Sequence, residues 1–131
     1  MNRAVIGLGS NIDPDAHIGR ALEALSAFGA ILKKSSVRET APLGAVGDVP
    51  YKNGVVLVET EQDLEAFQSR LKVIEETLGR RQVQKTSQRI TIDLDVVMWN
   101  GEVVRKEVFE RSFLAESIQE IGEKIRQAIA R

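Results

Sequence analysis

The chain has 131 residues, a length that allows one domain with a hydrophobic core but not two. Apolar residues make up 43% and charged residues 28%, as in ordinary globular proteins, and the net charge of −1 gives no indication of a nucleic-acid partner. Cysteine is absent, which excludes disulfides and thiolate metal sites. No apolar run suits a signal peptide or a membrane span, so we expect one cytoplasmic domain over residues 1–131.

The beginning of the chain combines a short apolar run with small residues. The run over residues 3–8 predicts a buried strand, and the segment 7–11, Gly-Leu-Gly-Ser-Asn, predicts the turn after it. This segment matches neither the dinucleotide fingerprint nor a Walker A loop with its lysine. His17 is the only histidine in the sequence, which disfavours a histidine metal site and a Ser-His triad.

A helix is predicted after this turn. Asn11 or Asp13 can cap it, Pro14 suits its first turn, and Gly29 is typical of a C-terminal cap. The apolar residues between them recur at helical spacing: Ile18, Ala21, Leu22, Leu25 and Phe28.

Two strands are predicted over residues 30–39 and 51–60. The side-chain period of two places Tyr51 and Asn53 on one face of the later strand, together with Val55 and Leu57. The connection over residues 40–50 is long for a hairpin and contains Pro and Gly. Long ordered connections in small domains are usually binding loops or lids, and we expect that role here.

Two further helices are indicated in the second half of the chain. Thr60 with Asp63 predicts the start of one, and Gly79 its end. Its apolar stripe consists of Leu64, Phe67, Leu71, Ile74 and Leu78. Ser117 with Glu120 predicts a capping box for a C-terminal helix whose apolar edge is Ile118, Ile121, Ile125 and Ile129.

The predicted order of elements is strand, helix, strand, strand, helix, strand and a final helix. This order is typical of a ferredoxin-like α+β sandwich, βαββαβ, with an antiparallel sheet, two helices on one face and an extra C-terminal helix. Right-handed crossovers put the first and third strands in the middle of the sheet. The other face of the sheet is then a candidate working surface.

Two carboxylates mark the last predicted strand, residues 90–99. Asp93 and Asp95 share one face, roughly 7 Å apart along the backbone, whereas the other face takes Ile92, Leu94, Val96 and Met98. The segment 80–89 before them carries four cations and no acid. Mg²⁺ prefers one or two carboxylates together with substrate phosphates, and arginine binds phosphate bidentately. The pattern favours a magnesium and polyphosphate site, although a lone pair of acids on a strand is more often a solvated face.

Two other side-chain pairs are weaker candidates. Lys72 and Glu75 are neighbours on one helix face, where a surface ion pair is the ordinary interpretation. Tyr51 and Asn53 follow the long loop, and an aromatic ring beside an amide can stack on and hydrogen-bond a flat heterocycle. A tyrosine in a strand can equally serve packing.

Five motifs in order give the chain a resemblance to the 6-hydroxymethyl-7,8-dihydropterin pyrophosphokinase family of folate biosynthesis. The resemblance extends from Ala4 to about Phe113. Its motifs are Gly9-Ser10-Asn11, Glu39-Thr40-Ala41-Pro42-Leu43-Gly44, Tyr51-Lys52-Asn53, Ile74-Glu75 with Gly79-Arg80, and Arg89-Ile90-Thr91-Ile92-Asp93-Leu94-Asp95.

The resemblance implies a ferredoxin-like fold and transfer of pyrophosphate from ATP to the hydroxymethyl oxygen of the pterin, leaving AMP. It implies that Asp93 and Asp95 hold two Mg²⁺ ions. The other implied roles are pterin binding by Thr40, Leu43, Tyr51, Asn53 and Phe113, ATP binding by Lys72, Glu75 and Val96, and phosphate neutralisation at the catalytic centre by Arg80, Arg89 and Arg111. The expected partners are these small molecules, with no nucleic acid and no membrane, and the expected state is a monomer or a weak homodimer.

The chain also departs from the family pattern. The family usually has a Trp-Gly-Pro-Arg segment before its acidic motif, where this chain has Thr86-Ser87-Gln88-Arg89-Ile90. Gln82 replaces an arginine of the family, and residues 104–111 are too few to hold a histidine-containing segment. Two hypotheses therefore stay open. One is a divergent Mg²⁺-dependent pyrophosphokinase, and the other is a non-catalytic or differently specific pterin- or nucleotide-binding module.

Overall fold

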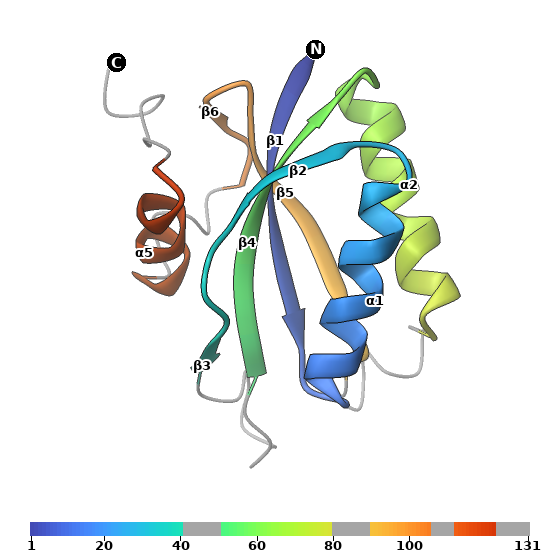
Figure 1. Cartoon of the computed structure of the whole chain (residues 1–131), viewed down its shortest axis with the longest axis vertical. Coiled ribbons are helices and arrows are strands. Elements are labelled where there is room, and N and C mark those ends of the chain that lie inside the picture. The colour runs from blue at the N-terminus through green and yellow to red at the C-terminus, as the bar shows by residue number, and fades with distance from the viewer. Residues whose placement is uncertain (41–50, 80–89, 106–111, 123–131) are drawn as a thin grey trace.

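Within the residues that the structure describes, an antiparallel sheet lies between two helices on one face and a third helix on the other. The computed structural model describes residues 1–40, 51–79, 90–105 and 112–122, without the side chains of Ser112 and Phe113. The expected basic segment 80–89, and all of the expected binding loop except Thr40, lie outside these residues. Helices α1 and α2 cover one face of the sheet, and α5 stands against the opposite face (Figure 1).

The elements follow the predicted order with one strand divided and one added. Their bounds are β1 Asn2–Ser10, α1 Pro14–Ser26, β2 Ala30–Lys34, β3 Arg38–Thr40, β4 Tyr51–Thr60, α2 Leu64–Thr77, β5 Asp93–Trp99, β6 Glu102–Val103 and α5 Ser112–Glu120. The strand order is β2-β4-β1-β5-β6, with β3 also paired to β4. The predicted first and third strands, β1 and β4, are neighbours in the middle, so the ferredoxin-like prediction is confirmed.

Alternation along the strands divides the buried residues into two layers. The layer beneath α1 and α2 includes Ala4, Ile6, Leu8, Val56, Val58, Phe67, Leu71, Leu94 and Val96. The layer beneath α5 consists of Val5, Val55, Leu57, Val97, Met98, Leu114, Ile118 and Ile121. Both faces of the central strands are therefore covered over part of their length, and burial of these aliphatic side chains is the main stabilising term.

The predicted strand over residues 30–39 is two strands, β2 and β3. Both pair with β4, and Ser35 lies at the break between them. The Ser35 hydroxyl accepts the Val55 N–H at 2.9 Å, and the Ser35 N–H donates to the Val55 carbonyl at 2.9 Å. A side-chain oxygen here replaces a backbone acceptor, which is why the continuous alternation expected from sequence is interrupted.

The predicted turn at residues 7–11 is wrong, because β1 continues to Ser10. Gly7 and Gly9 lie inside the strand, where Gly7 is opposite Val55 and Gly9 is opposite Asn53 of β4. A glycine inside a strand commonly marks a close approach of other atoms, and the site described below supplies the reason.

A bulge in β5 changes which face Met98 occupies. Val5 pairs with Met98 and Ile6 pairs with Val96, so Val97 is the extra residue between them. Val97 and Met98 both belong to the layer beneath α5. The prediction that Met98 lies on the face of Leu94 and Val96 is wrong, because a bulge adds one residue to the period of two.

The start of α2 differs from its predicted cap, whereas α1 begins at Pro14 after Asp13, as predicted. Asp63 is the cap of α2 and accepts the Ala66 N–H at 2.8 Å, whereas Thr60 ends β4 and accepts the Gln62 N–H at 3.1 Å. Asp13 holds the cap position of α1 in a left-handed conformation, φ 40°, without a side-chain capping bond.

Gly29 is not the C-cap of α1, which is Ala27. A side chain on Gly29 would begin 2.7 Å from Val58 Cγ1 and 3.0 Å from the Glu59 carbonyl oxygen. Glycine is required there by the approach of the chain to β4. Gly79 does follow α2 with φ 96°, as predicted.

Helix α5 begins earlier than its predicted capping box. Ser117 therefore lies inside the helix, and the Glu120 carboxylate bonds Ser36 and Arg38 instead of an N-terminus. Ile118 and Ile121 are buried as predicted, while Ile125 and Ile129 lie outside the described residues.

Strand β6 was not predicted, although the sequence holds its signal. Asn100 and Gly101 take φ 51° and 84° and connect β5 to β6. Asn-Gly at such angles is the preferred two-residue turn of a hairpin. Within the described part of the chain, no helix has the length and apolar character needed to cross a membrane.

Candidate active site

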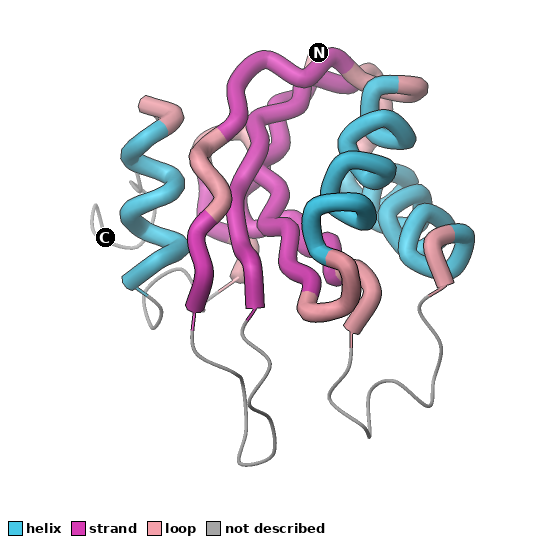
Figure 2. Tube along the Cα trace, turned by 60° about the horizontal axis from the view of Figure 1, so that its bottom comes forward, coloured by secondary structure: helices cyan, strands magenta, loops and turns pink. Residues whose placement is uncertain are grey.

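Four strand ends meet at one end of the sheet. Ser10 ends β1, Thr40 ends β3, Tyr51 begins β4 and Asp93 begins β5. Figures 1 and 2 show these ends on the same side of the molecule. On the sheet face that also carries α5, polar side chains of β3, β4 and β5 can thus face a common space.

Two rows of paired residues form the floor of this space. In the first row, Asp93 lies opposite Gly9 of β1, and Gly9 lies opposite Asn53 of β4. In the second row, Asp95 lies opposite Gly7. Asp93 and Asp95 share a face, as the period of two predicts. On that face, β1 carries only the glycines Gly7 and Gly9 between the two aspartates of β5 and the residues of β4.

Asp95 has an unusual electrostatic environment. Its Oδ1 lies 3.3 Å from Arg105 Nη1. Burial is the largest effect on its carboxyl group, followed by the negative charge of Asp93 and a hydrogen bond shared with Asp93, and together they raise the pKa of Asp95 from 3.8 to about 7. Arg105 lowers the pKa and Glu75 raises it by smaller amounts. Two carboxylates held this close repel each other and would be stabilised by a cation.

The donor set fits a hard divalent cation. Carboxylate oxygens suit Mg²⁺, which usually keeps water or substrate oxygens in its remaining positions. Among the described residues there is no group of three or more His, Cys, Asp and Glu side chains suited to a metal ion. Asp93 and Asp95 would therefore supply only part of an octahedral shell, and phosphate oxygens and water would complete it.

The predicted pterin residues that the structure describes lie together. The Asn53 side-chain N–H donates to Thr40 Oγ1 at 2.5 Å, which fixes the orientation of the amide. Tyr51 is buried, and its ring lies 3.5 Å from the point where a side chain on Gly9 would begin. An aromatic ring, an oriented amide and a hydroxyl can recognise the edge and face of a flat heterocycle.

The predicted ATP residues lie on the side of the sheet that α2 covers. Glu75 of α2 accepts the Leu94 N–H at 2.8 Å, so its carboxylate is tied to β5 between the two aspartates. Lys72 is exposed on the same helix. The Val96 side chain is buried beneath α1 and α2, on the face opposite Asp95, which leaves only its backbone for a ligand.

Several predicted residues lie outside the described part of the chain. They are Leu43, Arg80, Arg89, Arg111 and the side chain of Phe113, whose backbone is in the first turn of α5.

Sequence reasoning missed Arg105. The Val97 carbonyl of the bulge accepts the N–H groups of Val104 at 2.9 Å and Arg105 at 3.4 Å. This fold-back brings Arg105 to Asp95. The Asn100-Gly101 turn was the only sequence signal for it.

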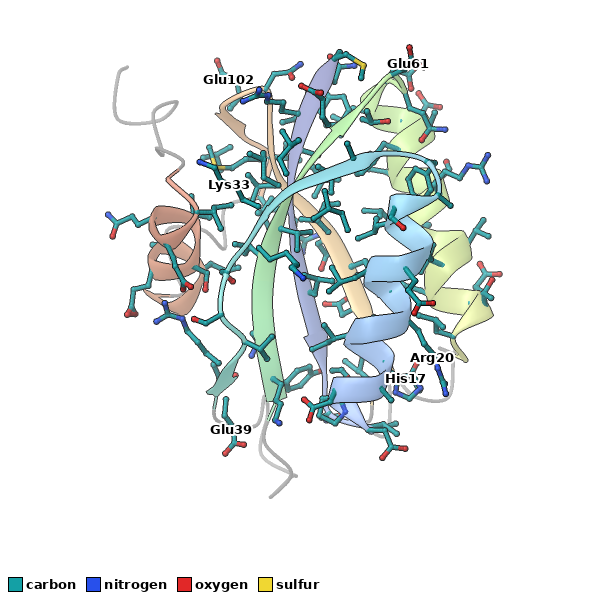
Figure 3. The ribbon with its side chains drawn as sticks, in the orientation of Figure 1. His17, Arg20, Lys33, Glu39, Glu61 and Glu102 are labelled. Atoms are coloured by element: carbon teal, nitrogen blue, oxygen red, sulfur yellow. The ribbon has the colours of Figure 1, made fainter. Side chains whose placement is uncertain are left out.

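Charged side chains near this end are not all part of the site. Figure 3 shows Glu39 at the end of β3 and His17 and Arg20 on α1. Glu39 alternates with Arg38 and Thr40 and is exposed. His17 Nδ1 lies 2.5 Å from the Ile12 carbonyl oxygen, a contact that is local to the start of α1.

The fold is that of a ferredoxin-like α+β protein, and paired carboxylates and an aromatic–amide pair on one sheet face are its candidate site. The sequence model of 7,8-dihydro-6-hydroxymethylpterin-pyrophosphokinase (HPPK) matches residues 5–123. The chain belongs to this family.

Curated relatives agree with this assignment. The chain is 32% identical over 110 residues to the 2-amino-4-hydroxy-6-hydroxymethyldihydropteridine pyrophosphokinase of Haemophilus influenzae, covering 82% of this chain and 68% of the relative. It is 30% identical over 135 residues to the protein of the same name from Bacillus subtilis, covering 95% and 80%.

Solved structures support the fold. The HPPK-DHPS protein of Plasmodium falciparum, crystallised with SDX-DHP, superposes with a TM-score of 0.56 at 17% identity. The match covers 84% of this chain and 32% of that chain.

Proposed function

We propose that this chain transfers the pyrophosphoryl group of ATP to the hydroxymethyl oxygen of 6-hydroxymethyl-7,8-dihydropterin, giving AMP. Members of its family are ATP-dependent diphosphokinases of folate synthesis. The observation that carries the proposal is the row in which Asp93, Gly9 and Asn53 lie side by side. This row puts a carboxylate suited to a cation and the amide expected to bind the pterin on the two strands that flank β1, with only a glycine between them.

Asp93 and Asp95 are proposed to hold two Mg²⁺ ions. When bound, the ions would neutralise the charge on the transferring phosphates and orient them. The fold holds the two carboxylates in place. Asp93 begins β5, and Glu75 anchors this strand by accepting the Leu94 N–H. Positioning and charge stabilisation are the main protein contributions to phosphoryl transfer, because little covalent chemistry is asked of the side chains.

Thr40, Tyr51 and Asn53 are proposed to bind the pterin, with Leu43 and Phe113 completing the pocket. The Thr40 hydroxyl accepts one Asn53 N–H, so the amide is held before a ligand arrives. A pre-organised amide loses less entropy on binding. The buried Tyr51 ring offers a flat surface beside it.

Lys72, Glu75 and the Val96 backbone are proposed for ATP, and Arg80, Arg89 and Arg111 for the phosphates. We add Arg105 to the residues proposed to bind the phosphates. It balances the charge of Asp95 at 3.3 Å, and a cation at Asp95 would free its guanidinium for a phosphate oxygen. We further propose that one domain performs the reaction in the cytoplasm, where ATP is available, as a monomer or a weak homodimer.

The direct test mixes the protein with ATP, Mg²⁺ and the hydroxymethyl dihydropterin and measures AMP and the pterin diphosphate. Formation of both in equal amounts supports the proposal. Pterin binding in calorimetry, without binding of Mg²⁺ and a non-hydrolysable ATP analogue, would instead support a non-catalytic pterin-binding module.

A further inference from the structure

Polar contacts tie the C-terminal end of α5 to the break between β2 and β3. Glu120 Oε1 lies 2.7 Å from Arg38 Nη2, and Glu120 also accepts the Ser36 N–H at 2.7 Å and the Ser36 hydroxyl at 2.9 Å. Glu116, one turn earlier, lies 3.6 Å from Arg38 Nη1. One arginine thus contacts two successive turns of the helix.

Arg38 also belongs to the floor of the candidate site. It lies directly opposite Asn53, and Thr40 lies opposite Tyr51, on the short strand β3. Residues paired in this way share a face, so Arg38 extends the row of Asp93, Gly9 and Asn53 toward α5. The arginine is therefore the link between the residues expected to bind the pterin and the helix that stands beside them.

Exposed ion pairs usually contribute little to stability, because solvent screens them and side-chain entropy opposes them. The contacts of Glu120 differ because three donors fix one carboxylate in one orientation. Three hydrogen bonds hold the pKa of Glu120 below its ordinary value. The bond from Arg38 has the largest effect, and those from the Ser36 backbone N–H and hydroxyl have smaller effects. The contacts of Glu120 with Arg38 and Ser36 therefore fix the position of the C-terminal end of α5 along the sheet.

Apolar packing alone leaves this position less well defined. Leu114, Ile118 and Ile121 attach α5 to Val55 and Val97 among other aliphatic side chains. Such contacts are non-directional and tolerate small shifts of a helix. The first turn of α5 carries Phe113, expected on the pterin, and Leu114, whose Cδ2 lies 3.7 Å from the point where a side chain on Gly7 would begin. A shift of the helix would change the width of the site at its first turn.

We propose that Arg38 and Glu120 are positioning residues for the pterin subsite, holding α5 at a fixed distance from Asn53 and Tyr51. The inference rests on the proposed function, because it concerns the same pocket. Neither residue touches the cation site. Loss of the pair leaves the hydrophobic layer beneath α5 in place, so the chain still folds, but the pterin is bound less tightly.

The test compares R38Q, E120Q and the double variant with wild type and with R3Q. Arg3 makes an exposed ion pair of 3.4 Å with Glu59 on β4, so R3Q removes the same charge from the same sheet away from α5. The readouts are KM for the pterin, KM for ATP, kcat, and pterin affinity by calorimetry without ATP.

We expect R38Q and E120Q each to raise the pterin KM and Kd about fivefold, with KM for ATP and kcat within about twofold of wild type. The effect of the double variant should be smaller than the sum of the two single effects, because the Arg38–Glu120 contact is lost in all three variants. R3Q should resemble wild type in every readout.

Four results separate the possible failures. Equal pterin Kd in wild type, R38Q and R3Q would overturn the positioning role, as would additive effects in the double variant. A wild-type protein that binds pterin but forms no AMP would overturn the proposed reaction alone, since Kd still reports on the pair. A wild-type protein that binds no pterin would overturn both.

Discussion

Gly9 on β1 lies directly opposite Asn53 on β4, and a side chain on Gly9 would begin 3.1 Å from the Asn53 Oδ1 atom. That distance is shorter than an ordinary van der Waals contact. The space above Gly9 is therefore occupied by the amide itself, which Thr40 holds from the other side.

G9A should weaken pterin binding. The added methyl group must displace the Asn53 amide, and we expect the pterin KM to rise about threefold to tenfold, because small misplacements of a binding group are costly. Steady-state kinetics with the pterin varied at saturating ATP measure this change.

G7A is the matched control. A side chain on Gly7 would begin 3.6 Å from Val97 Cγ1 and 3.7 Å from Leu114 Cδ2, which are ordinary contact distances. We expect G7A to keep the pterin KM of wild type. Equal effects of the two substitutions would show that the space above Gly9 has no special role.

The raised pKa of Asp95 predicts a pH dependence of the metal-free protein. Its folded pKa of about 7 exceeds the ordinary value of 3.8, so its contribution to stability is fully present below pH 3.8. That contribution is lost as pH rises through about 7. Carbon-detected NMR titration should show the Asp95 carboxyl titrating near neutrality in wild type and at lower pH in D93N, because the Asp93 charge raises this pKa.

Mg²⁺ should shift that titration. A proton and a cation compete for the same carboxylate, so apparent Mg²⁺ affinity should rise with pH up to about 7 and then level off. An Asp95 carboxyl that titrates near 3.8 without metal would contradict the burial and the repulsion inferred for this site.

The face shared by Asp93 and Asp95, and by Tyr51 and Asn53, follows from the strand period and could be predicted from the sequence. Met98 could not be placed in this way, because the Val97 bulge depends on how β5 pairs with β1. A local pattern carries the period of a strand but not the position at which the period is interrupted.

Contacts between distant segments were also beyond the sequence. Arg38 and Glu120 are 82 positions apart, and each has an ordinary local interpretation, as a strand residue and as part of a helix cap. Arg105 reaches Asp95 only because the chain folds back at Asn100 and Gly101. The family resemblance indicated the chemistry of the site, while the charge partners required the fold.

Gly29 should be required for stability although it has ordinary backbone angles. G29A places a methyl group 2.7 Å from Val58 Cγ1 and 3.0 Å from a backbone oxygen, and we expect a loss of about 1–3 kcal/mol in the free energy of unfolding. Urea unfolding followed by circular dichroism measures this loss.

G19A, in the helix that precedes Gly29, should instead raise the free energy of unfolding. Gly19 lies within α1 and a side chain there would meet nothing within 4 Å. Because alanine favours a helix over glycine, G19A should stabilise the chain by about 0.5–1 kcal/mol.

A G29A protein with the same free energy of unfolding as wild type would contradict the prediction for Gly29. It would show that the segment after α1 can move away from β4.

The measurement that tests the central claim most directly is the rate of AMP formation by D93N and D95N, with D15N as control. Asp15 is an exposed aspartate on α1 paired with Lys52 at 3.2 Å, so D15N makes the same chemical change outside the cation site. We expect D93N and D95N each to lower the rate on the order of a hundredfold or more at saturating substrates and Mg²⁺, and D15N to remain within about twofold of wild type. Wild-type rates in both D93N and D95N would contradict the assignment of this carboxylate pair to the reaction.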